Sequence, residues 1–165
     1  MKLLVIGETL IDLVPGPKGR EAVLGGSPYN VAIGLGRLGA QVGIATSLST
    51  DADGQRFKAA LEVDGVDLSC VAIVNKPSPT ALVEDGTKES GPRYVFTLSG
   101  TAFDEPTPLP LPWSDTLSHI HAGSIAAILG PMAQSVLNAF AAARDKHTTS
   151  YDPVSYTHLT LPTKA

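Results

Sequence analysis

The alternation of short apolar segments with helical segments constrains this chain more than any other feature of its sequence. Leu3–Ile6 is entirely apolar and ends at Gly7, which is typical of a strand buried on both faces. A helix is predicted to begin at Ser27, where a capping hydroxyl precedes a proline, and to end at Gly39. A second apolar strand, Val42–Ala45, follows. This order indicates an α/β fold with a parallel sheet and helical crossovers.

The same alternation continues further along the chain. Asp51 or Asp53 is expected to cap a helix that ends at Gly65. Near the end of the chain, we expect a strand, a helix and a strand at Leu117–His121, Gly130–Lys146 and Thr148–Tyr151. Between these portions, three β-prone segments predict strands, some of which belong to a small accessory sheet: Val71–Val74, Ala81–Glu84 and Arg93–Leu98.

Composition excludes several classes of protein. The 165 residues are 43% hydrophobic and 17% charged, which is typical of a soluble globular domain. A net charge of -4 argues against nucleic acid or an anionic membrane as the main partner. Cys70 is the one cysteine, so an intrachain disulfide is excluded. Leu3–Ile6 is too short for a signal peptide and no segment has the length of a transmembrane helix, so we expect a cytoplasmic protein.

The segment Gly34–Gly39 matches the dinucleotide-binding pattern G-x-G-x-x-G. That motif requires a strand before it and a helix N-terminus after it, so that backbone N–H groups face a pyrophosphate. Here the glycines lie late in a predicted helix and a strand follows. We therefore expect these glycines to pack the helix against the sheet.

Two other features suggest a binding site. Gly25 and Gly26 precede a helix start, where glycine lets a ligand approach free N–H groups, and Asn30 in the first turn offers an amide donor and acceptor. Asp12 follows the first strand, at the edge where open α/β sheets bind ligands, and its carboxylate can accept hydrogen bonds from two neighbouring hydroxyls. A tight turn and a capping aspartate are the structural alternatives. Whether Glu8 supports Asp12 is left open.

Taken together, these features resemble the PfkB family of ribokinase-like carbohydrate kinases, and fructokinases in particular. The resemblance covers about residues 1–153. It rests on these segments: Gly7-Glu8-x-Leu10-Ile11-Asp12, Gly25-Gly26-x-x-x-Asn30-x-Ala32, Leu38-Gly39, Ser49-Thr50-Asp51-x-Asp53-Gly54, Tyr94-x-Phe96-x-x-x-Gly100-Thr101-Ala102 and Tyr151-Asp152-Pro153. It implies a Rossmann-like sandwich with a parallel central sheet and a small β-sheet lid, formed by about residues 13–24, 71–84 and 93–98.

The resemblance also implies a function. An intact member would transfer the γ-phosphoryl group of ATP to a sugar hydroxymethyl group, with Mg²⁺ and a monovalent-cation loop. Asp12 would accept hydrogen bonds from sugar hydroxyls, and Gly25, Gly26 and Asn30 would line the same pocket. Tyr94 or Phe96 would present an aromatic wall to the sugar, unless these rings pack in the core. Homodimers through the lid are common in the family.

The chain departs from the family pattern in three places. Ser49 stands where the signature has glycine, and Val154 replaces the asparagine expected after Asp152-Pro153. The later Gly-Ala-Gly-Asp segment, which carries the catalytic base and the anion hole, is absent, so no catalytic residue is assigned in this chain. We expect a truncated, inactive fragment that binds ATP poorly. Residues 154–165 resemble translated sequencing-adapter sequence; a natural divergent tail is the alternative.

Two rival functions stay open. A kinase of the same fold could act on 2-keto-3-deoxygluconate or a nucleoside, since a few pocket side chains decide specificity. A naturally short, non-catalytic binding or oligomerisation module is the second rival. His119 and His121 alternate along a predicted strand with no carboxylate or cysteine at ligand spacing, so no metal site is assigned.

Overall fold

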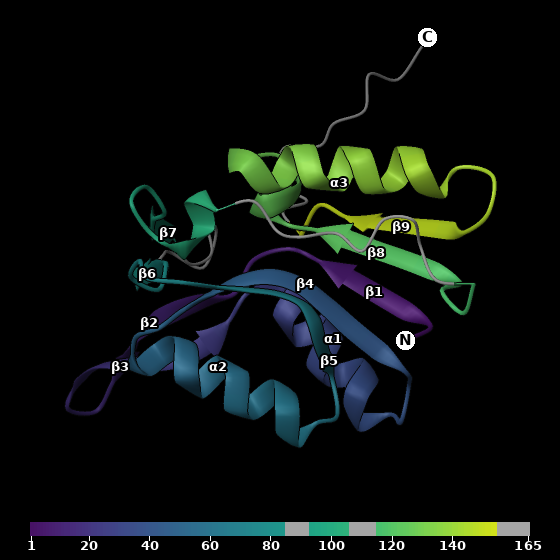
Figure 1. Ribbon diagram of the computed structural model, residues 1–165. Coiled ribbons are helices and arrows are strands. Elements are labelled where there is room, and N and C mark those ends of the chain that lie inside the picture. The colour runs from purple at the N-terminus through teal and green to yellow at the C-terminus, as the bar shows by residue number, and fades with distance from the viewer. Residues whose placement is uncertain (85–92, 106–114, 155–165) are drawn as a thin grey trace, which may run out of the picture.

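Five parallel strands form the central sheet of the protein (Figure 1). The structure is a computed structural model that describes residues 1–84, 93–105 and 115–154. The strand order is β5-β4-β1-β8-β9, which places β1 in the middle. The strands are β1 (Leu3–Ile6), β4 (Val42–Ser49), β5 (Asp67–Val74), β8 (His119–Gly123) and β9 (Thr148–Asp152).

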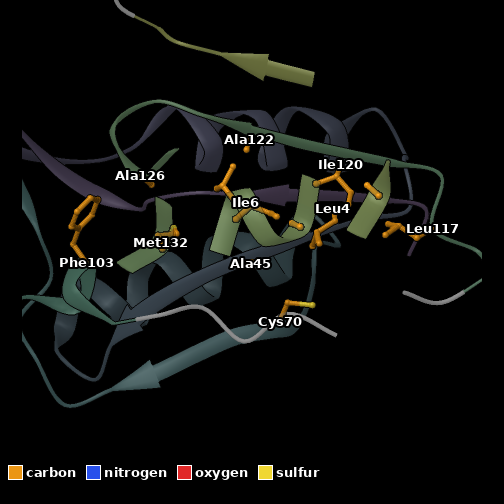
Figure 2. Close-up of a cluster of buried hydrophobic side chains, with 13 residues drawn as sticks. Leu4, Ile6, Ala45, Cys70, Phe103, Leu117, Ile120, Ala122, Ala126 and Met132 are labelled. Carbon is orange, nitrogen blue, oxygen red and sulfur yellow. The ribbon is translucent and has the colours of Figure 1, made fainter. Parts of the chain in front are cut away.

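Helices cover both faces of this sheet, and each face has its own core. The helices are α1 (Ser27–Arg37), α2 (Ala52–Val63) and α3 (Gly130–Ala143), with short 3₁₀ turns η1 (Ala102–Asp104) and η2 (Ile125–Ala127). Leu4 and Ile6 of β1 point toward α3, where they pack with Met132 (Figure 2). Val5 points the other way and joins the cluster that contains residues of α1 and α2. β1 is therefore buried on both faces, as its all-apolar run predicts.

Four further strands form a second, smaller sheet beside the central one (Figure 1). Its order is β3-β2-β6-β7. The strands are β2 (Leu10–Gly16), β3 (Gly19–Gly25), β6 (Thr80–Glu84) and β7 (Arg93–Thr97). β2 and β3 form an antiparallel hairpin, while β2 and β6 run parallel. No helix in the described ranges is long and apolar enough to cross a membrane.

The start of α1 differs from its prediction. Gly26, with a φ of 104°, is the N-cap residue, and no side-chain hydroxyl caps the helix, so the prediction that Ser27 does so was wrong. Such a φ belongs to the region that favours glycine. Gly36 lies inside α1, where a Cβ would collide with the carbonyl oxygen of Asp64. The glycine therefore lets α1 approach the end of α2, and its contact is with that helix end rather than with the sheet.

The middle of the chain requires a correction. Val71–Val74 was expected near the lid, but these residues belong to β5, which pairs with β4 in the central sheet. Of the range 71–84, only β6 contributes to the second sheet. The expected lid segment 13–24 lies within a hairpin of β2 and β3 that spans residues 10–25. Residues 155–165 of the proposed tail lie outside the described residues.

Candidate functional site

Asp12 lies on β2, directly opposite Val23 of β3 and Ala81 of β6. Its carboxyl group lies over the α-carbon of Gly25, since a Cβ built at Gly25 would be 2.9 Å from Asp12 Cγ and nearer still to Oδ2. Only glycine leaves this space free. The close approach brings the carboxylate to the point where β3 ends and α1 begins.

The first turn of α1 completes this corner of the molecule. Gly26 caps the helix, and a Cβ there would be 2.6 Å from the carbonyl oxygen of Glu8. The N–H of Asn30 donates to the carbonyl oxygen of Gly26 at 3.0 Å, and the Asn30 side chain is exposed. The neighbouring Tyr29 is buried instead and meets the ring of Phe57 edge-on. The structure thus brings Asp12, Gly25 and Gly26 together, with Asn30 one helical turn further on.

Phe96 shares a face of the second sheet with Asp12. Ala81 is paired with Asp12 on one side and with Phe96 on the other, and residues paired across strands project to the same face. Two strand spacings separate Asp12 from Phe96, or roughly 10 Å. Tyr94 lies two residues before Phe96 and therefore on the same face, and the two rings stack with centroids 6.1 Å apart. Tyr94 is 49% exposed and Phe96 43%, so neither ring packs in the core.

The opposite face of this sheet is attached to the body of the protein. Ile11, Leu13 and Leu24 belong to the apolar cluster that contains Phe57 of α2. Ile11 pairs with Leu24 in the hairpin, which places both on one face, and Asp12 alternates to the other. The acidic and aromatic face is therefore directed away from the packed face.

The carboxyl group of Asp12 is in an unusual electrostatic position. Burial raises its pKa above the ordinary value, because desolvation penalises the charged form. Among the described residues, none donates a hydrogen bond to this carboxyl group. A half-buried carboxylate of this kind gains free energy from any ligand hydroxyl that donates to it, because the lost hydration is then replaced.

The carboxyl group of Glu8 is hydrogen-bonded to the turn η2, which follows β8. Its side chain is 2% exposed, and Oε2 accepts the N–H of Ala126 at 3.1 Å. Burial raises the pKa of this carboxyl group, and a hydrogen bond from the Ser124 hydroxyl acts in the opposite direction. Ser124 has φ 61° and ψ −158°, which is a region used almost only by glycine. The buried carboxyl thus stabilises a strained turn that local sequence does not reveal.

His119 and His121 lie on one face of β8 and are joined through β9. Ser150 Oγ is 2.8 Å from His119 Nε2 and from His121 Nδ1, and Thr148 Oγ1 is 2.7 Å from His119 Nδ1. Burial lowers the pKa of His121. Within residues 1–84, 93–105 and 115–154, no group of three or more His, Cys, Asp or Glu side chains could hold a metal ion.

The corner around Asp12 and the α/β architecture can be compared with known proteins. The sequence model of the pfkB family of carbohydrate kinases matches residues 1–164. The chain belongs to this family. Its central sheet and second sheet are those of the ribokinase-like fold.

Individual relatives agree with the family assignment. A fructokinase from Rhizobium leguminosarum bv. trifolii is 34% identical over 139 residues, which cover 81% of this chain and 42% of that protein. The solved structure of Xylella fastidiosa fructokinase with bound ATP has a TM-score of 0.76 at 19% identity, covering 99% of this chain and 55% of that one. The 2-dehydro-3-deoxygluconokinase of Thermotoga maritima has a TM-score of 0.77 at 21% identity, covering 94% and 51%. The chain therefore spans about half the length of these pfkB-family relatives.

Proposed function

We propose that this pfkB-family chain carries the sugar-binding part of a fructokinase-like kinase, which transfers the γ-phosphoryl group of ATP to a sugar hydroxymethyl group. The fructokinase relatives support the substrate class. The second sheet acts as a lid over the sugar, and its acidic and aromatic face supplies the contacts. The chain's own residues bind and orient the sugar.

One observation carries this proposal: the half-buried Asp12 carboxyl lies over Gly25 without a hydrogen-bond donor of its own among the described residues. Vicinal hydroxyls of a sugar fit such a carboxylate, because it can accept two hydrogen bonds side by side. Phe96 projects from the same sheet face, two strand spacings away, and offers an apolar ring surface.

No nucleotide or magnesium site is assigned among the described residues. The Gly-Ala-Gly-Asp segment is absent from the sequence. We therefore expect no turnover with ATP and any hexose in a coupled ADP-release assay, and measurable turnover by the purified chain would contradict this part of the proposal.

Binding of D-fructose tests the sugar site directly. Isothermal titration calorimetry with the 165-residue chain should detect fructose, and Asp12→Asn should weaken it by about tenfold or more, since hydrogen bonds to a charged acceptor are each worth about 1.5–3 kcal/mol. Asp145→Asn, at an exposed position before β9, is the matched control and should leave binding unchanged. Equal affinity of Asp12→Asn and the wild-type chain would refute the assignment.

The similarity to the Thermotoga maritima 2-dehydro-3-deoxygluconokinase supports a second candidate substrate, a keto-deoxy sugar acid. Such a substrate carries a carboxylate, which a site built on Asp12 would repel. Titration with the sugar acid in parallel with fructose distinguishes the two. Tighter binding of the acid would favour the second candidate.

A further inference from the structure

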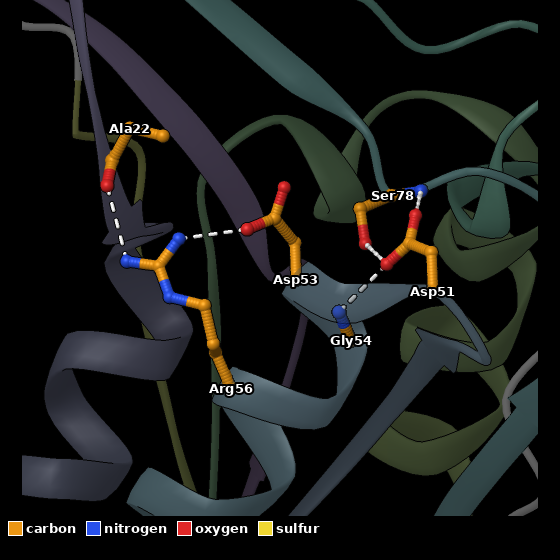
Figure 3. A network of polar contacts seen from close by, with 6 residues as sticks. All are labelled: Ala22, Asp51, Asp53, Gly54, Arg56 and Ser78. Atoms are coloured by element: carbon orange, nitrogen blue, oxygen red, sulfur yellow. Dashed lines mark hydrogen bonds and ion pairs between the residues drawn. The ribbon is translucent and has the colours of Figure 1, made fainter.

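Side chains at the beginning of α2 are hydrogen-bonded to the second sheet and to the connection that leads into it (Figure 3). The Arg56 guanidinium pairs with Asp53, with Nη1 2.7 Å from Oδ1. Its other terminal nitrogen donates to the carbonyl oxygen of Ala22 at 3.1 Å. Ala22 belongs to β3, so Arg56 ties this strand to α2. The ion pair with Asp53 fixes the orientation of the guanidinium that makes the bond.

Asp51 makes a second connection from the same end of the helix. Its carboxylate caps α2 by accepting the N–H of Gly54, and it also accepts the N–H and the hydroxyl of Ser78 at 2.7 and 2.8 Å. Burial acts to raise the pKa of Asp51, but these hydrogen bonds outweigh it and hold the pKa below its usual value. Ser78 lies in the connection between β5 and β6, so this carboxylate ties the approach to β6 to α2.

These two connections reach the strands on either side of Asp12. β3 pairs with β2 at Val23 and Asp12, next to Ala22. On the other side, the N–H of Ile11 donates to the carbonyl oxygen of Pro79, which follows Ser78. The strand that carries Asp12 therefore lies between β3, which is hydrogen-bonded to Arg56 of α2, and β6, whose preceding connection is hydrogen-bonded to Asp51 at the cap of α2.

We propose that Arg56 and Asp51 are positioning residues for the sugar site, which fix β3 and the β5–β6 connection so that the Asp12 carboxylate stays over Gly25. This inference rests on the proposed function of Asp12. It gives the Asp51-x-Asp53-Gly54 motif a role beyond helix capping, because the same carboxylate that caps α2 holds the second sheet.

Two variants test the connections without removing the helix cap. Arg56→Met keeps the length of the side chain and removes the donors to Ala22 and Asp53. Ser78→Ala removes the hydroxyl that donates to Asp51, keeps the Ser78 N–H as a donor and leaves Asp51 to cap α2. Lys58→Met is the matched control, since Lys58 lies on the same helix and, among the residues that the structure describes, forms an exposed ion pair with Glu62 alone.

Fructose affinity, amide hydrogen exchange and thermal midpoint are measured for each. Arg56→Met and Ser78→Ala should each weaken fructose binding by about fivefold, which corresponds to the loss of one hydrogen bond of about 1 kcal/mol. Amide hydrogen exchange should become faster by a similar factor in residues 10–25, because the second sheet loses a hydrogen bond to the beginning of α2. The exchange rates of β1 and β4 should stay unchanged. Lys58→Met should match the wild-type chain in binding and exchange.

The outcomes separate this inference from the proposed function. If the wild-type chain binds fructose and neither Arg56→Met nor Ser78→Ala changes affinity or exchange, the positioning role is refuted. If the wild-type chain binds no fructose, the proposed function fails and exchange alone decides: faster exchange in residues 10–25 supports the connections, and unchanged exchange overturns them. If Arg56→Met does not melt cooperatively, Ser78→Ala decides.

Discussion

Gly25→Ala is expected to damage the proposed sugar site by displacing the side chain of Asp12. The backbone of Gly25 lies outside the positive-φ region, so alanine introduces no backbone strain there. The new Cβ would lie 2.9 Å from Asp12 Cγ, whereas ordinary contact begins at 3.4 Å, so the carboxyl group must retreat by about 0.5 Å or more. A displacement of this size breaks well-formed hydrogen bonds, whose donor–acceptor distances span only about 0.5 Å.

We expect Gly25→Ala to weaken fructose binding by about tenfold, the loss of one hydrogen bond to a carboxylate. The assay is calorimetric titration, with the thermal midpoint measured in parallel. A double-mutant cycle with Asp12→Ala isolates the cause: once the carboxyl is removed, Gly25→Ala should have no further effect on binding. If Gly25→Ala binds fructose as tightly as the wild-type chain, or weakens binding equally in the Asp12→Ala background, the carboxylate is not the group that holds the sugar.

Three further predictions concern stability and reactivity. Because burial raises the pKa of Glu8, the native state holds the carboxyl proton more tightly than the unfolded state, and the free energy of unfolding should fall as the pH rises from about 4.5 through the raised pKa. Glu8→Gln should flatten this pH dependence, measured by urea unfolding at several pH values. An unchanged dependence of the free energy on pH would contradict the prediction. Gly34→Ala should raise the free energy of unfolding by up to about 1 kcal/mol, since its new Cβ meets open space within the helix α1. Gly36→Ala should lower the free energy of unfolding, because its Cβ collides with the carbonyl oxygen of Asp64. Equal urea midpoints for the two variants would refute both expectations. Cys70 is buried with a raised pKa, so its thiol should react with a thiol reagent far more slowly in the native chain than in urea, and equal rates would argue against its burial.

The sequence predicted the elements whose signals are local. The apolar run of β1, the helix starts near Pro28 and Asp51, and the return to α/β alternation at β8 are all visible in short windows, and the structure confirms them. Asp51, one of the two capping residues proposed, is the one that caps α2. The family resemblance was likewise visible in short motifs.

The features that the sequence did not predict depend on residues far apart in the chain. Val71–Val74 is β-prone in either sheet, and only its pairing with β4 decides that it joins the central one. Glu8 finds its partner at Ala126, 118 residues away, so no local pattern could reveal it. Ser27 looked like the cap of α1, but the positive φ of Gly26 supplies the turn instead. The roles of Asp12, Gly25, Gly26, Asn30, Tyr94 and Phe96 in holding a sugar stay predictions.

The second sheet is assembled from separate parts of the chain: the hairpin of residues 10–25, and the strands at 80–84 and 93–97, with β2 joined to β6 by parallel pairing. It is not an insertion at one point, so it cannot be excised or transplanted as one cassette. Replacing this sheet with that of another pfkB-family protein would require two simultaneous replacements that preserve the register of Ile11 with Thr80. Substrate specificity in such a fold is therefore expected to diverge by substitution within these strands rather than by shuffling of a whole module.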